Sequence, residues 1–154
     1  MKAEELMIGD WVQIVEPCKY AGAIGRIKTL IDHKDNENAY FKVFLRNNTI
    51  CIGIEDICSE DIRPIPLTTE ILENIGFYGG EYKHYCGDVW HLELEGFIEI
   101  GFTYSNGKGV LWGAKIKSNY PITIVDKFVI PNITCLHELQ HAMKLCRIDK
   151  KFEL

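Results

Sequence analysis

Five residues near the end of the sequence, His137-Glu138-Leu139-Gln140-His141, match the H-E-x-x-H pattern of zinc peptidases. In that chemistry the two histidines lie one helical turn apart and bind one zinc ion, and the glutamate activates a zinc-bound water. The chemistry also needs a third ligand and a cleft toward which the histidines point. A hydrolase interpretation therefore depends on Glu138 as the catalytic residue and on His137 and His141 as the metal ligands.

The residues that follow the motif do not supply a standard third ligand. The extended metzincin pattern requires Gly and His where this sequence has Lys144 and Arg147. The downstream carboxylates are Asp149 and Glu153. A ligand from an upstream histidine or cysteine would be atypical for this class of peptidase.

The periodicity of the same segment favours an ordinary amphipathic helix. At about 100° per residue, one apolar face is formed by Leu136, Leu139, Met143 and Cys146. His137 and His141 fall on the opposite side, so we expect them to face solvent if the apolar face packs on a sheet. Leu145 interrupts that polar side, which indicates a covering element or a partner chain. We therefore predict no metal and no cofactor, with zinc as the alternative; exposed histidines at this spacing also bind metal adventitiously.

A second group of metal-binding residue types is His84, Cys86, Asp88 and His91, within the stretch "HYCGDVWH". On a strand, His84 and Cys86 share a face because side chains alternate, and a hairpin could bring His91 near them. The paired cysteine spacings of zinc knuckles are absent. The favoured interpretation is a polar hairpin with one buried cysteine.

Composition limits the classes of function. The chain has 154 residues and a net charge of −5, with 8 Lys and Arg against 11 Asp and Glu in residues 1–66 and 9 against 11 in residues 67–154. Neither part is basic, which argues against phosphate binding as the main activity. There is no signal-like or membrane-spanning apolar run, and the six cysteines have no C-x-x-C pair. We predict a cytoplasmic protein with reduced thiols and no membrane contact.

Turn signals divide the chain into many short elements. Strands are predicted at 11–15, 22–31, 40–45 and 49–54, followed by a helical turn and a last strand, which suggests a small β-barrel over residues 1–66. The prolines of "RPIPLT" mark the boundary. Residues 67–154 are predicted to form helices near 69–76 and 133–146, packed on an antiparallel sheet of strands at 81–86, 89–97, 98–104, 109–116 and 122–130, the last ended by Pro131. The fold class is therefore β-rich α+β, with a small barrel followed by the sheet and its two helices.

The stretch "GDWVQIVEPCKYAGAIGRIKTL", residues 9–30, resembles the KOW-type motif of SH3-like barrels. The matching positions are Gly9, Val12, Gly22, Gly25 and Ile27. A tight turn between strands needs glycine where φ is positive or where backbones approach closely. The resemblance implies an SH3-like fold for residues 1–66, but such barrels bind RNA, bind protein or serve as scaffolds.

The whole chain also resembles a family of short uncharacterised proteins common in gut bacteria and their mobile elements. The similarity is carried by "LMIGDWV", "IRPIPLTTEILENIGF" and "LHELQHAMKL". In that family the closing segment usually reads His-x-Leu-Gln-Asn, which implies that His141 stands where an amide usually stands. The resemblance brings no established activity with it.

Together these features favour a non-enzymatic cytoplasmic interaction or accessory protein with an unidentified protein partner. The alternatives are a zinc-dependent hydrolase and a module that binds nucleic acid through the first barrel, since aromatic rings beside arginines can stack on bases. Exposed sheet edges would also allow a homodimer. The predicted binding surface of the barrel consists of Trp11, Tyr20, Arg26, Tyr40 and Arg46.

Overall fold

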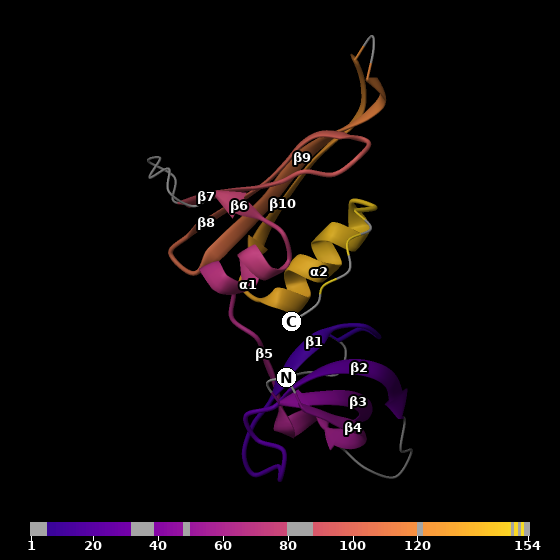
Figure 1. The fold of residues 1–154 in the computed structure, drawn as a ribbon, viewed down its shortest axis with the longest axis vertical. Helices are drawn as coiled ribbons and strands as arrows, with labels where there is room; N and C mark the ends of the chain where they lie inside the picture. Colours follow the sequence, from indigo (N-terminus) through magenta and orange to yellow (C-terminus); the bar gives the residue numbers. More distant parts are fainter. Residues whose placement is uncertain are drawn as a thin grey trace. The chain divides into compact units, whose positions relative to one another are not determined.

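The computed structural model describes residues 6–31, 39–47, 50–79, 88–119, 122–148, 150 and 152. The chain forms two compact units, residues 1–65 and 66–154. Each unit is built on a five-stranded antiparallel sheet, and the second unit also carries two α-helices (Figure 1). The predicted β-rich α+β class is confirmed. Within the described residues, no helix is long and apolar enough to cross a membrane.

The sheet of the first unit has the strand order β4-β3-β2-β1-β5. Its elements are β1 (Trp11–Ile14), β2 (Ile24–Ile31), β3 (Tyr40–Asn47), β4 (Ile50–Cys58), the short 3-10 helix η2 (Ser59–Asp61) and β5 (Ile62–Pro64). The strand predicted to end at residue 54 continues to Cys58 because β4 stays paired with β3 as far as Tyr40. In the described part of this unit, β4 and β5 are the two edges, and no pairing joins them.

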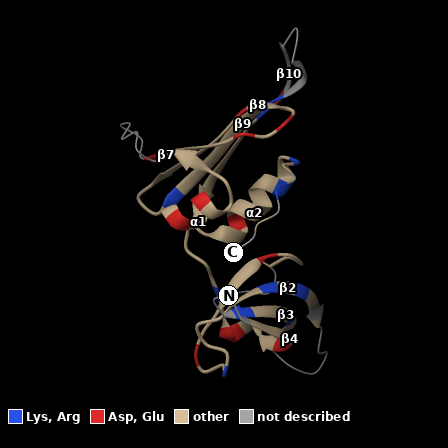
Figure 2. Cartoon of the chain, in the orientation of Figure 1, with Lys and Arg blue, Asp and Glu red and all other residues tan. Residues whose placement is uncertain are grey.

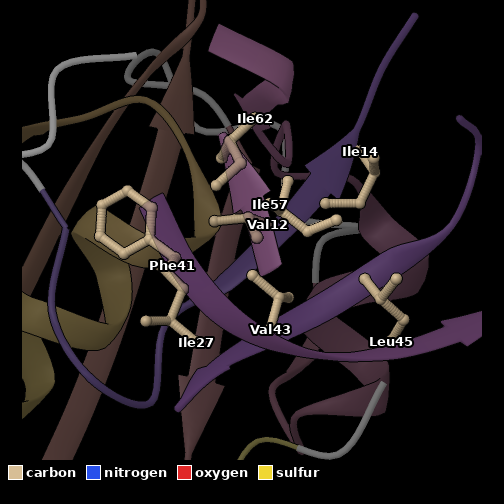
Figure 3. Packing of buried hydrophobic residues seen from close by; sticks show 8 residues of the cluster. All are labelled: Val12, Ile14, Ile27, Phe41, Val43, Leu45, Ile57 and Ile62. Atoms are coloured by element: carbon tan, nitrogen blue, oxygen red, sulfur yellow. The ribbon is translucent and has the colours of Figure 1, made fainter. Parts of the chain in front are cut away.

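One apolar cluster fills the interior of the first unit (Figure 3). Its members come from all five strands and are Val12, Ile14, Ile27, Phe41, Val43, Leu45, Ile57 and Ile62. They occupy alternate positions along β1 and β3, as expected where one face of a sheet is buried. The opposite positions carry Gln13, Lys42 and Arg46 together with the aromatic rings of Trp11, Tyr40 and Phe44.

Two glycines of the stretch at residues 9–30 have the roles expected of them. Gly22 has φ +89 in the turn that leads into β2. Gly25 lies on β2 against β3, where an added Cβ would overlap the side chains of Val43 and Leu45. The second glycine is therefore required by close packing, not by its own backbone angle.

The sheet of the second unit has the strand order β10-β9-β8-β7-β6. Its elements are α1 (Thr69–Asn74), β6 (Tyr78–Gly79), β7 (Asp88–Leu92), β8 (Phe97–Ser105), β9 (Lys108–Asn119), β10 (Ile122–Ile133) and α2 (Leu136–Leu145). The strand predicted at residues 81–86 lies outside the described residues. Buried residues of both helices and of β7, β8 and β9 make the core, with Leu72, Trp90, Ile100, Phe102, Leu111, Leu136, Leu139 and Met143 among them.

Local signals account for the ends of α1. Thr68 is the N-cap, and its hydroxyl accepts a hydrogen bond from the Ile71 N–H at 3.3 Å. Gly76 follows the helix with φ +93, the left-handed conformation that ends many helices. The predicted start and stop of this helix are thus confirmed.

The prediction that Pro131 ends the last strand is wrong. Strand β10 continues to Ile133. Proline has no backbone N–H to donate to a neighbouring strand. An edge strand such as β10 tolerates this loss, because one of its sides has no neighbouring strand to pair with. The register with β9 also shifts between Ile130 and Ile133, so the proline lies within an irregular part of the ladder.

Candidate functional site

The start of α2 is held by Glu138, the glutamate of the H-E-x-x-H pattern. Its Oε2 accepts two hydrogen bonds from Thr134, one from the backbone N–H at 2.6 Å and one from the hydroxyl at 2.8 Å. The N-cap residue, Cys135, makes no side-chain cap of its own. Glu138 therefore acts like a capping-box glutamate, except that it reaches back to Thr134, one residue before the N-cap.

These contacts also set the ionisation of Glu138. Partial burial raises the pKa of the carboxyl, but the two hydrogen bonds from Thr134 lower it, and Cys135 and His137 lower it further. The net pKa is lowered, so Glu138 is a stabilised carboxylate and a weaker base. A general base in a hydrolase requires the opposite adjustment, toward neutral pH.

The prediction that His137 faces solvent is wrong, because its side chain is only 5% exposed. The prediction from the helical periodicity assumed that only the apolar face of the helix is covered by other residues. His137, however, lies in the first turn, where the preceding residues fold against it, and Cys135 Sγ is 3.2 Å from His137 Nδ1. His141 is half-buried, and its ring meets that of His137 at 5.7 Å between centroids and 74° between planes.

Cys135 completes a compact group of donor atoms at this helix start. The ligand atoms of Cys135, His137 and Glu138 all lie within 4.8 Å of one another. Burial raises the pKa of the Cys135 thiol to about 11, so the thiol is protonated at neutral pH and is not an activated nucleophile. The group differs from the pair expected from the sequence, since it adds Cys135 and does not depend on His141.

Only part of the second sequence-predicted cluster can be placed. His84 and Cys86 lie outside the described residues. Asp88 is exposed at the start of β7, and the half-buried His91 is near its end. His91 Nδ1 is 3.6 Å from Glu99 Oε1 on β8, so this histidine belongs to a different group of residues.

That group surrounds a cavity of about 580 Å³ in the second unit. The cavity lies where β7 turns into β8, and its walls are formed by Tyr78, His91, Leu92, Glu93, Leu94, Glu95, Phe97, Glu99 and Ile100. Three of these residues carry carboxylates and none carries a lysine or arginine side chain. Its volume falls within the range of about 300–1,000 Å³ typical of ligand sites.

Hydrogen bonds and ring contacts order the polar groups of this cavity. The Tyr78 hydroxyl donates to Glu93 Oε1 at 3.0 Å, and this bond, followed by burial and the charges of Glu93 and Glu99, raises the pKa of Tyr78. The rings of Tyr78 and His91 lie 6.0 Å apart on the paired strands β6 and β7. The glutamates therefore face the cavity beside aromatic surfaces.

A glycine on β8 allows two rings to meet across that strand. His91 on β7 and Trp112 on β9 both pair with Gly101, and their rings make a perpendicular contact at 6.2 Å. An added Cβ at Gly101 would overlap the Trp112 ring. The indole N–H of Trp112 also donates to Thr103 Oγ1 at 3.2 Å, which fixes the ring over the sheet beside His91.

The five residues of the predicted barrel surface do not form one site. Trp11 pairs directly with Arg26, but Trp11 is only 6% exposed. Tyr20 packs against the core of the first unit. Tyr40 and Arg46 lie at opposite ends of β3, about 20 Å apart at the rise of an extended strand. Among the five, Trp11 and Arg26 are directly paired across two strands.

Comparisons of the chain with protein-family models, with curated proteins and with solved structures gave no match. A functional interpretation therefore has to rest on the residues and contacts themselves.

The cavity was not predicted from the sequence, although one residue beside it, a glycine within a predicted strand, indicated an unusual contact there. Gly101 stands alone in the strand "IEIGFTY", and an isolated glycine in a strand indicates a close approach by another group. Tyr78 and the three glutamates gave no such signal, because their positions depend on the pairing of β6 with β7 and of β7 with β8 and on the turn between β7 and β8.

Proposed function

We propose that this protein is a non-enzymatic interaction protein whose cavity beside β7 and β8 accepts a basic side chain of a protein partner. The observation that carries the proposal is the composition of the cavity wall: among the described residues that form it, there are three glutamates and three rings and no lysine or arginine. A lysine or arginine of a partner would neutralise the carboxylates and lie against the rings.

The aromatic walls suit a cation for a physical reason. A positive group within about 6 Å of a ring centroid is attracted by the electrons of the ring face. One of these rings already makes a contact of this kind within the chain: Lys115 Nζ lies 5.6 Å from the centroid of the Phe97 ring. The Tyr78 bond to Glu93 adds orientation, because it holds one carboxylate at the rim of the cavity.

The state of the H-E-x-x-H residues also supports a non-enzymatic role. A zinc peptidase needs the glutamate of the motif free to take a proton from water. Here two hydrogen bonds from Thr134 occupy Glu138 Oε2 and its pKa is lowered. The zinc-dependent hydrolase is therefore the less favoured candidate.

For the first unit we propose an SH3-like barrel that serves as a scaffold. Its strand order, β4-β3-β2-β1-β5, with a 3-10 turn between β4 and β5, is the support for this assignment. The expected resemblances, of residues 9–30 to a KOW-type motif and of the whole chain to short proteins of bacterial mobile elements, are consistent with the same proposal. An accessory role for the whole chain is consistent with both.

A selection of displayed peptides against the full chain tests the proposed cavity. We expect enriched peptides to contain lysine or arginine, and to bind the double variant Glu93→Gln/Glu99→Gln at least about tenfold more weakly. The double variant Glu70→Gln/Glu73→Gln makes the same change in net charge at exposed positions of α1 and serves as the control. Enrichment of neutral or acidic peptides, or equal loss in both variants, would contradict the proposal.

One observation favours a second candidate, nucleic-acid binding by the first unit. Arg26 pairs with Trp11 on one side and with Phe44 on the other, and Lys28 Nζ lies 5.5 Å from the Phe44 ring. Figure 2 shows the basic residues on β2 and β3. Titration with single-stranded RNA and DNA at about 50 mM salt, where phosphate contacts are strong, tests this candidate; absence of binding there would remove it.

A further inference from the structure

We propose that Cys135, His137 and Glu138 together bind one divalent transition-metal ion of the zinc class at the start of α2. The three residues come from four consecutive positions, and their donor atoms lie within 4.8 Å of one another. This site is made of residues other than those of the cavity beside β7, and its test is independent of the proposed function.

The separations between the donor atoms match what one ion requires. Zinc binds sulfur at about 2.3 Å and nitrogen or oxygen at about 2.0–2.2 Å in tetrahedral geometry, so donors that share the ion stand about 3–4 Å apart. Cys135 Sγ and His137 Nδ1 are 3.2 Å apart. The Glu138 carboxylate offers an oxygen within 4.8 Å of both of these atoms.

The surroundings of the three side chains also suit a bound metal. Cys135 and His137 are each only 5% exposed, so water competes little for the ion there. Thr134 holds Glu138 Oε2 with two hydrogen bonds, as outer-shell partners do when they orient a ligating carboxylate. Thiolate, imidazole and carboxylate are donor types that zinc accepts, and the Cys135 thiol, protonated in the metal-free chain, would release its proton to solvent as the ion binds.

The proposed site differs from the peptidase arrangement in a testable way. In H-E-x-x-H enzymes the two histidines bind the metal and the glutamate does not. Here Cys135 and Glu138 would be ligands, and His141 would not be needed. The competing explanation is a thiol–imidazole hydrogen bond between Cys135 and His137 with no metal at all.

Titration of the full chain with Co²⁺, a spectroscopic substitute for zinc, separates these arrangements. After treatment with a chelator, we expect one Co²⁺ per chain and a thiolate-to-cobalt charge-transfer band in the near ultraviolet. Cys135→Ser should lose the band and bind at least about 100-fold more weakly, since even outer-shell changes cost about 10–100-fold. Cys146→Ser, at the other end of the same helix, is the matched control and should behave as the wild type.

Two further variants keep the result interpretable if Cys135→Ser unfolds the chain. Glu138→Gln retains an acceptor for Thr134, so the helix should persist by circular dichroism while Co²⁺ binds at least about tenfold more weakly. His141→Gln should leave binding unchanged. A wild-type chain that takes up no Co²⁺, or binding that is lost in His141→Gln and kept in Cys135→Ser, would overturn the proposal.

Discussion

Replacement of Glu138 by alanine removes a side chain that holds the start of α2. Glu138 Oε2 accepts hydrogen bonds from the backbone N–H and the hydroxyl of Thr134, at 2.6 and 2.8 Å. Loss of a capping side chain typically costs about 0.5–2 kcal/mol, and a carboxylate in the first turn adds about 0.3–1 kcal/mol through the helix dipole. We therefore expect Glu138→Ala to lower the free energy of unfolding by about 1–2 kcal/mol.

Glu138→Gln separates the hydrogen bonds from the charge. The amide oxygen can still accept from Thr134, so the expected loss is about half that of the alanine variant. Because the pKa of Glu138 is lowered in the folded chain, its carboxylate stabilises the fold above the ordinary value of 4.5, and this contribution is lost as the pH falls through the lowered pKa. The difference between wild type and Glu138→Gln should therefore be full at pH 7 and shrink below about pH 4.5.

The assay is urea unfolding of the metal-free chain, followed by circular dichroism with chelator present. Two units can unfold separately, so the transition that contains the helical signal is compared. Glu73→Ala, near the end of α1, is the control and should change stability by no more than about 0.5 kcal/mol. If Glu138→Ala were as stable as the wild type at pH 7, the capping role would be wrong and Glu138 would be available as a base.

Three other predictions follow from the packing of the second unit. Gly101→Ala should destabilise the chain by about 1–3 kcal/mol, because the added methyl overlaps the Trp112 ring; urea unfolding checks this, and an unchanged midpoint would contradict it. Cys135 should react with iodoacetamide at pH 7 at least about tenfold more slowly than the exposed Cys51; equal labelling by mass spectrometry would refute its burial. Leu145→Ser should change stability by less than about 0.5 kcal/mol, because Leu145 is 77% exposed; a larger loss would mean that the residue is covered in solution.

The elements with strong local signals were predictable from the sequence. Short apolar and aromatic stretches between turn signals predicted β1 and β3, and the apolar positions of the closing segment predicted much of the buried face of α2. Thr68 and Gly76 marked the ends of α1. These signals depend on near neighbours in the chain, which a sequence displays directly.

The features that were not predictable depend on contacts between distant or irregular segments. Pro131 could be placed inside β10 only by knowing that this strand lies at an edge of the sheet. The burial of His137 depends on how the chain enters α2 from β10, which a helical wheel ignores. The cavity depends on Tyr78, His91 and Glu99 meeting through the register of three strands.

The NMR signals of the indole N–H groups of the three tryptophans test most directly whether a basic partner binds in the cavity of the second unit or on the first unit. Trp112 contacts His91 beside the cavity, Trp90 is buried in the core of the second unit, and Trp11 lies on β1 of the first unit. In a ¹⁵N-edited NMR titration, a selected basic peptide should shift the indole N–H signal of Trp112 and leave that of Trp11 in place. A shift of Trp11 alone, or no shift at saturating peptide, would contradict binding of a basic partner in the cavity of the second unit.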